Sequence, residues 1–231
     1  MIKNLTLGMT VGAVASAAVA IAAAMMTPRE VLDAHGADEI GQIAELHFDF
    51  VVVRNDNEMR RSWQWHPITG DVRFQQGEDV YEYNRNTMTE ADEPVDGMWI
   101  NDTFWAYWPM HAQWTADATV TVEEPMPNPV TDAEEPRLVI AYPADGGGYT
   151  PGDRYEIYLD ENGLGTAWTF HRGGGEAPNL ANSFENYVMA GPLAIPTLFQ
   201  SRDGGFRLEI QNVKYRLEGE SAAREATPLE P

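Results

Sequence analysis

The sequence predicts a mainly β protein, in which one antiparallel domain carries a short N-terminal helix and a single helical insertion. The first observation is a period of two that starts near residue 45, where Leu46, Phe48 and Phe50 share one face of an extended chain. The second is the spacing of turn residues, which divides residues 45–83 into four short segments, as in a β meander. The third is an aromatic segment at residues 98–114 that breaks this rhythm.

The N-terminus has the layout of a secretory signal peptide. Lys3 is followed by an uncharged run at residues 5–26, and the alanines near its end fit the small-x-small pattern that a signal peptidase requires. Cleavage is expected after Ala24, so residues 1–24 are predicted to be the signal peptide and the mature protein to be periplasmic. The alternative is a retained membrane anchor, because about 20 apolar residues can span a bilayer.

The composition limits the partners. The absence of cysteine excludes disulfides, thiolate metal sites and the lipid-modified cysteine of a bacterial lipoprotein. Acidic residues number 36 against 15 basic ones, and the formal net charge is −21. Such a field repels phosphate backbones, so we expect no nucleic acid partner. Without disulfides the domain must be held together by its hydrophobic core, and we expect a monomer.

Two helices are expected. Thr27 and Glu30 form a capping pattern around a proline at the first helical position. In the aromatic segment, Asn101 or Asp102 can cap a short helix, and Pro109 limits its length or kinks it. Four of the seven tryptophans lie in this segment. This helix is therefore predicted to plug the concave side of the sheet or to cover it as a lid.

Further strands are predicted after this helix, at residues 119–122, 137–142, 154–159, 166–171, 187–193, 198–201 and 206–215. The loops between them are rich in proline, glycine and acidic residues, which indicates strand boundaries within one domain. Residues 25–217 are therefore expected to form a single domain. Residues 218–231 have charge and alanine but no second apolar face, and they are expected to form a disordered acidic tail.

Catalytic and metal-binding patterns are weak. Asp49 and Glu82 could supply the carboxylate pair of a glycosidase, which needs a fixed separation between its two acids. His47 and Asp49 share a strand face, but single histidines such as His111 are usually surface or packing residues. We therefore predict no catalytic residue, no metal site and no cofactor, and a protein that is not an enzyme.

The aromatic residues are more informative. If the sheet curls, its aromatic face can enclose an apolar cavity with the helix as its cover. The alternative is that the aromatic side chains fill the core around the helix, since a domain of roughly 200 residues needs such a core. The residues predicted to line or cover the cavity are Phe50, Trp63, Trp65, Phe104, Trp105, Trp108, Trp168 and Phe170.

Four segments carry a resemblance to a known family. They are WQWHPITGDV at residues 63–72, VYEYNR at 80–85, INDTFW at 100–105 and YTPGD at 149–153. Together with the order of the predicted elements, they resemble the LolA-like superfamily of bacterial envelope proteins, which sort lipoproteins or bind lipids, over residues 45–216. The resemblance implies an incomplete, open β barrel around a hydrophobic cavity, with helices as a lid, that binds lipid without catalysis.

The resemblance favours a periplasmic binding or carrier protein for a lipid, an acyl chain or a lipoprotein. Two alternatives stay open. One is a secreted hydrolase of envelope glycans or esters, in which Asp49, Glu82 or His111 would converge in one cleft. The other is a non-catalytic scaffold of an envelope complex. The expected partners are therefore a lipid or an acylated lipoprotein, together with envelope proteins.

Overall fold

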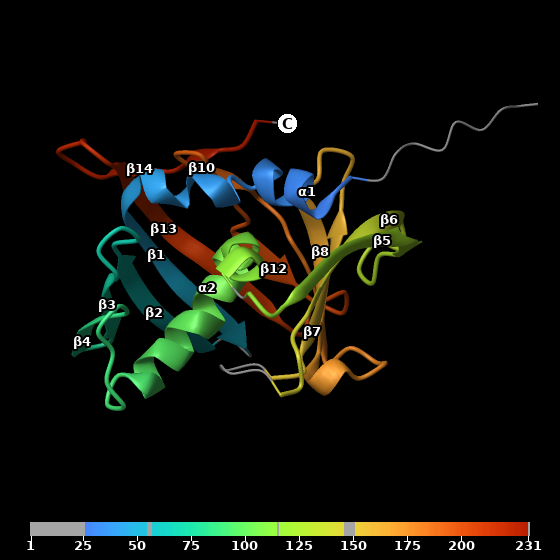
Figure 1. The fold of residues 1–231 in the computed structure, drawn as a ribbon, viewed down its shortest axis with the longest axis horizontal. Helices are drawn as coiled ribbons and strands as arrows, with labels where there is room; N and C mark the ends of the chain where they lie inside the picture. The colour runs from blue at the N-terminus through green and yellow to red at the C-terminus, as the bar shows by residue number, and fades with distance from the viewer. Residues whose placement is uncertain (1–25, 55–56, 115, 146–150, 231) are drawn as a thin grey trace, which may run out of the picture.

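The computed structural model describes residues 26–54, 57–114, 116–145 and 151–230, so the predicted signal peptide lies outside the described residues. Within these ranges the chain forms three antiparallel sheets and two α-helices (Figure 1). The predicted fold class is confirmed, because the protein is mainly β with a short N-terminal helix and a helical insertion. The two larger sheets are not closed on themselves.

The largest sheet contains the predicted meander. Its strand order is β12-β13-β1-β2-β3-β4, with β14 beside β13. The register places Phe48 opposite Trp63 and Trp63 opposite Phe74, so one face presents a row of buried aromatic side chains. Its strands are β1 (Ile43–Arg54), β2 (Asn57–Trp65), β3 (Asp71–Gln76), β4 (Asp79–Asn84), β12 (Leu198–Gln200), β13 (Arg207–Leu217) and β14 (Arg224–Glu225).

The second sheet follows the chain order from β5 to β9, with each strand antiparallel to the next. A backbone bridge between Glu185 and Leu198 links the segment after β9 to β12, which brings the two sheets side by side (Figure 1). A small third sheet has the order β11-β10-β15. The strands of these two sheets are β5 (Thr119–Pro127), β6 (Glu134–Ala141), β7 (Arg154–Leu159), β8 (Gly165–His171), β9 (Leu180–Ser183), β10 (Val188–Ala190), β11 (Leu193–Ile195) and β15 (Thr227–Pro228).

Two expectations for the C-terminal part are corrected. The strand predicted at residues 187–193 divides into β10 and β11, because Gly191 adopts a φ of 65° and turns the chain between them. Residues 224–228, which belong to the tail expected to be disordered, instead form two short strands, since β14 pairs with β13 and β15 pairs with β10. The Arg224 guanidinium also lies 4.9 Å from the ring centre of Tyr215. The two strand pairings use backbone groups at strand edges, which leave no apolar period in the sequence.

α1 (Pro28–Ala34) begins at the predicted capping box. The Glu30 N–H donates to the Thr27 hydroxyl at 3.3 Å, and the Thr27 N–H donates to the Glu30 carboxylate at 2.7 Å. A short 3-10 helix, η1 (Ala37–Gln42), follows after Gly36. Gly36 has a φ of 72°, and a Cβ atom there would overlap the carbonyl oxygen of Pro192. Glycine at this position therefore permits close contact between the N-terminal helices and the loop before β11.

α2 (Glu93–Trp114) is longer than predicted. It begins at Glu93 instead of near Asn101, because the carbonyl of Asp92 accepts the first helical N–H groups and a proline stands in the first turn. The predicted effect of Pro109 is confirmed as a kink, since Tyr107 leaves helical geometry with φ −130° and ψ 32°. None of the helices in the described part of the chain is long and apolar enough to cross a membrane.

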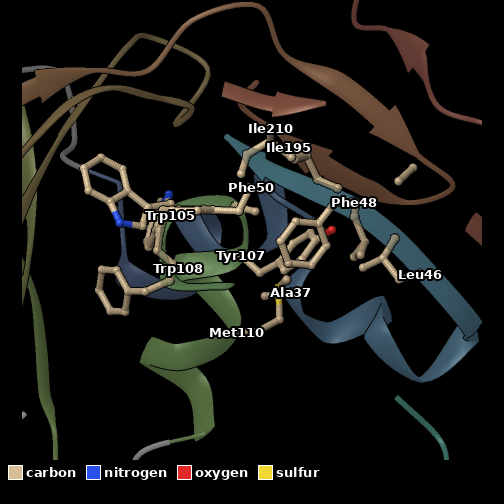
Figure 2. Close-up of a cluster of buried hydrophobic side chains, with 14 of the residues drawn as sticks. Ala37, Leu46, Phe48, Phe50, Trp105, Tyr107, Trp108, Met110, Ile195 and Ile210 are labelled. Carbon is tan, nitrogen blue, oxygen red and sulfur yellow. The ribbon is translucent and has the colours of Figure 1, made fainter. Parts of the chain in front are cut away.

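The C-terminal half of α2 fills the space between the sheets. Figure 2 shows Tyr107 and Trp108 of this helix among Phe48 and other side chains of β1. Tyr107 and Trp108 are at most 1% exposed, and the Tyr107 and Phe48 rings meet edge to face at 5.5 Å between centres. Over this half, the helix is a plug whose aromatic side chains form the core.

The burial of His35 predicts a pH-dependent stability. Its Nδ1 atom lies 2.9 Å from the Val31 carbonyl oxygen, and burial lowers its pKa from 6.5 to about 4. Between these values the unfolded state binds more protons, so stability falls as the pH falls. His35→Asn keeps a donor for Val31 but does not titrate. From pH 6.5 to 4.5, urea unfolding should show wild type losing about 2 kcal/mol more than the variant. Parallel pH profiles would contradict this.

The close approach at Gly36 predicts a matched pair of variants. Gly36→Ala should lower the free energy of unfolding by about 3 kcal/mol or more. The new methyl group must displace the Pro192 backbone, and the alanine must also adopt a strained positive φ. Gly77 also has a positive φ, of 62°, but open space around it, so Gly77→Ala should cost only about 1 kcal/mol. Thermal or urea unfolding of both variants measures the difference. Equal losses would show that the contact with Pro192 contributes nothing.

Candidate functional site

A hollow lies beside α2, between the two larger sheets. It consists of a pocket of about 450 Å³ against the second sheet and a pocket of about 420 Å³ against the first. Asn101, Trp105 and Leu180 line both pockets, so the pockets adjoin, and we call them together the interlayer groove. The other lining residues are Gly97, Ile100, Phe104, Asp153, Tyr155, Trp168, Phe170 and Arg172 in the first pocket, and Phe50, Val52, Arg54, Met59, Arg61, Phe206 and Leu208 in the second.

The wall of the groove toward the second sheet is built from stacked rings. Tyr155 of β7 and Trp168 of β8 stack at 5.6 Å between centres, and Phe104 of α2 lies 4.1 Å from Tyr155. Trp105 meets Trp168 edge to face at 4.6 Å. These contacts restrict the side chains on both elements, so this wall is already formed without a ligand.

The wall toward the first sheet combines apolar side chains with arginines. Phe206 stacks on Trp105 at 5.7 Å, and the Arg54 guanidinium lies 5.4 Å from the Phe206 ring centre. Arg61 of β2 lies over the Phe50 ring at 4.8 Å. The guanidinium groups therefore rest on aromatic faces at the edge of an otherwise apolar surface.

A buried acid attaches α2 to the first sheet beside this wall. Asp102 is fully buried, and it accepts hydrogen bonds from Arg61 Nη2 at 2.6 Å and from Trp63 Nε1 at 2.8 Å. Burial raises the pKa of Asp102 to about 6, while the Arg61 charge and the hydrogen bonds from Asn101 and Trp63 oppose the rise. The position of the helix, and with it the width of the groove, depends on this contact.

The structure divides the predicted site residues into two groups. Phe104, Trp105, Trp168 and Phe170 line the pocket against the second sheet, and Phe50 and Trp105 line the other. Trp63, Trp65 and Trp108 are at most 4% exposed and pack within the core, away from both pockets. Of the two alternatives for the aromatic residues, an open pocket describes the first group and a filled core describes the second. The role of the lining residues in ligand binding stays a prediction.

Several lining residues were missed at the sequence level. Leu180 belongs to β9, a strand too short to show a period, and Phe206 lies in the loop before β13. Arg54 and Arg61 are charged, and a search for apolar cavity residues does not select them. A usable signal was present for Arg61, because it shares a strand face with Trp63 and Trp65.

The residues considered for hydrolysis have separate surroundings. Asp49 accepts a hydrogen bond from Arg60 at 2.6 Å, and Glu82 pairs with Arg73 at 3.3 Å. His111 is buried within α2. Asp49 lies on β1 and Glu82 on β4, with β2 and β3 between them, so the three side chains do not meet in one cleft. Within the described ranges, there is no cluster of three or more histidine, aspartate or glutamate side chains that could hold a metal ion.

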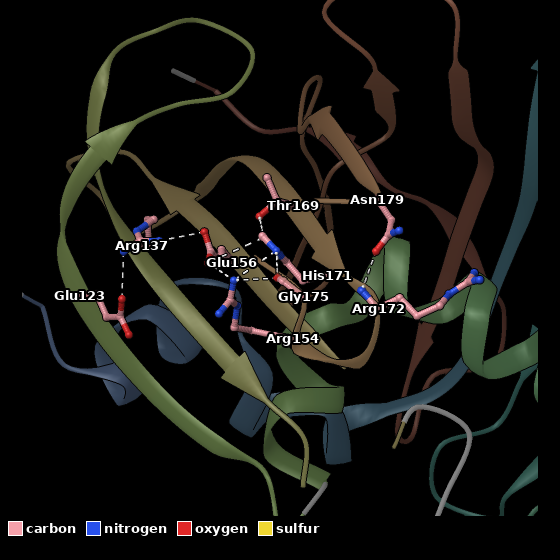
Figure 3. A network of polar contacts seen from close by, with 9 residues as sticks. All are labelled: Glu123, Arg137, Arg154, Glu156, Thr169, His171, Arg172, Gly175 and Asn179. Carbon is pink, nitrogen blue, oxygen red and sulfur yellow. Dashed lines mark hydrogen bonds and ion pairs between the residues drawn. The ribbon is translucent and has the colours of Figure 1, made fainter. Parts of the chain in front are cut away.

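The opposite face of the second sheet carries a polar network (Figure 3). Glu156 accepts a hydrogen bond from Arg137 at 2.8 Å and pairs with Arg154 at 3.3 Å, while Thr169 Oγ1 and His171 Nε2 lie 3.0 Å apart. These residues alternate along β7 and β8 with those that line the groove, so they point away from it. Their other partners are Glu123 of β5 and the Gly175 carbonyl, and the network connects β5, β6, β7 and β8.

Fold and groove together define a class: a mainly β protein of two open antiparallel sheets, with an aromatic helix between them and an apolar groove beside that helix. Solved structures that are similar in fold include three proteins. A LolA superfamily protein from Nitrosomonas europaea is 13% identical, with 83% of this chain and 94% of that chain covered and a TM-score of 0.48. A DUF1329 family protein from Desulfovibrio piger is 10% identical, with 84% and 94% covered and a TM-score of 0.44.

The third similar structure is a domain assigned to outer membrane lipoprotein sorting, from Vibrio parahaemolyticus. It is 10% identical, with 84% of this chain and 94% of that chain covered and a TM-score of 0.43. No protein-family model and no curated protein matches the chain. The likeness to these structures concerns the fold alone, and two of them carry the names that the sequence motifs led us to expect.

The raised pKa of Asp102 predicts a second pH effect, of opposite sign to that of His35. Because its folded-state pKa of about 6 exceeds the usual 3.8, the folded state binds more protons between these values, and stability falls as the pH rises. Asp102→Asn keeps the side-chain shape but does not titrate. From pH 4 to 6.5, wild type should lose about 2 kcal/mol relative to the variant in urea unfolding. A constant difference between the two proteins would disprove the assignment.

Proposed function

We propose that the protein is a periplasmic binding or carrier protein, not an enzyme, that holds a lipid, an acyl chain or the acylated end of a lipoprotein in the interlayer groove. The observation that supports this most is the groove itself, which α2 leaves open although the helix fills the rest of the space between the sheets. Its walls are mainly aromatic and aliphatic, and each of its two pockets falls within the usual range of ligand pockets, roughly 300–1,000 Å³.

The apolar surface of the groove is partly in contact with water. Leu180, which lines both pockets, is 37% exposed, and Ile100 and Phe206 are half-buried. An acyl chain that covers these side chains removes apolar surface on both partners, which contributes about 0.8 kcal/mol for each buried methylene. Because the aromatic wall is already ordered, little of this gain is lost to rearrangement.

The periplasmic location belongs to the same proposal and rests on the layout of residues 1–24. Intact-mass measurement of protein recovered from an envelope fraction tests it, since cleavage after Ala24 removes a defined mass. Native mass spectrometry and lipid extraction of the same material test for cargo. Recovery of the protein without any acyl compound, together with failure to bind added acyl chains, would refute the binding proposal.

A charge placed in the groove should abolish binding without unfolding the protein. Leu180→Asp adds a carboxylate where the chain would lie, and we expect at least a tenfold loss of affinity for an acyl probe, because a charged group there must lose its hydration. Val80→Asp is the matched control, since Val80 is 48% exposed on β4 and lies outside the groove. Equal binding by Leu180→Asp and Val80→Asp would place the ligand elsewhere.

A further inference from the structure

The charges around the interlayer groove differ from those of the whole chain. Acidic residues outnumber basic ones by 36 to 15 in the sequence, yet the lining of the groove includes three arginines and a single acid, Asp153. The arginines come from both sides, with Arg54 and Arg61 on the first sheet and Arg172 in η2 (Arg172–Gly174), directly after β8. A locally cationic groove in an acidic protein indicates a ligand with a negative charge.

The three arginines are not equivalent. Arg61 is bound to the buried carboxylate of Asp102 at 2.6 Å, so its charge is already compensated. Arg54 and Arg172 are exposed, and neither side chain forms an ion pair with any residue that the structure describes. Figure 3 shows the Arg172 side chain extending away from the ion pairs on the opposite face of the sheet. Two guanidinium groups that have no ion pair among the described residues therefore border the groove, one from each sheet.

The pockets that contain these two arginines share an apolar floor. Arg54 lines the pocket against the first sheet and Arg172 the pocket against the second, and Trp105 and Leu180 belong to both. Arg54 also rests over Phe206, which holds its guanidinium at the edge of the apolar surface. A molecule that covers Trp105 and Leu180 thus has an anion-binding group within the lining on either side.

We propose that the interlayer groove selects an anionic amphiphile, whose chain lies over Trp105 and Leu180 and whose charged head binds the arginine on the side that it reaches, Arg54 or Arg172. Guanidinium groups form paired hydrogen bonds with carboxylates and phosphates, which a neutral head cannot match. The acidic surface repels small anions, so the head binds only when the chain occupies the groove. This inference rests on the proposed function, because it requires that the groove accept a chain.

Two probes that share one chain test the inference. Palmitate and hexadecanol are compared by competition against a fluorescent acyl probe. The protein is the full mature chain, and each amphiphile is kept below the concentration at which it aggregates. Wild type should bind palmitate at least about tenfold more tightly than hexadecanol. In the Arg54→Gln/Arg172→Gln double variant, the preference should fall to less than about twofold, with the affinity for hexadecanol unchanged. Arg29→Gln, which removes one guanidinium charge from the exposed face of α1, should keep the preference.

The outcomes separate this inference from the proposed function. If both amphiphiles bind equally to wild type, or if the preference survives in the double variant, the groove binds chains but does not recognise an anionic head. If neither amphiphile binds, the proposed function fails as well. Butyrate has the same carboxylate head but almost no chain, so it should not compete. If butyrate competes at the concentration at which palmitate does, the site binds any small anion, and the inference is overturned.

Discussion

The packing of α2 between two open sheets is the constraint on which the rest of the structure depends. Residues 102–112 of this helix are buried without a break, so it is surrounded by protein on all sides over three turns. The rings of β1, β2, β7 and β8 that contact it would otherwise face water, because neither sheet covers the other's concave face. Each buried aromatic side chain removes about 150–250 Å² of surface from water. The helix therefore stabilises both sheets at once.

The groove follows from where this packing ends. The first turns of α2 are less buried than the rest, and Ile100 and Asn101 stand where the two sheets separate. Asp102, the first residue of the continuously buried stretch, is hydrogen-bonded to Arg61 and Trp63, so a charged contact holds the helix in place beside the groove. The same helix thus contributes to the core and to the wall of the groove.

The sequence predicted those features that depend on local pattern. The meander from β1 to β4, the capping box at Thr27 and the kink caused by Pro109 were all visible, because period, cap and proline chemistry act over a few residues. β9, β14 and β15 were not, since strands of two to four residues form by pairing with distant edges. For the site, the aromatic walls were predicted, but the division between Trp105 in the groove and Trp108 in the core depends on tertiary packing.

The pairing of the C-terminal residues has a practical consequence for work with this protein. β14 and β15 cover edges of β13 and β10, so residues 224–228 are part of the folded unit. Shortening the chain at residue 217, or replacing the last residues by an affinity tag, would uncover backbone groups on both strands. Free strand edges recruit other chains, and a shortened preparation would then self-associate. A tag joined through a linker after Pro231 leaves both edges protected.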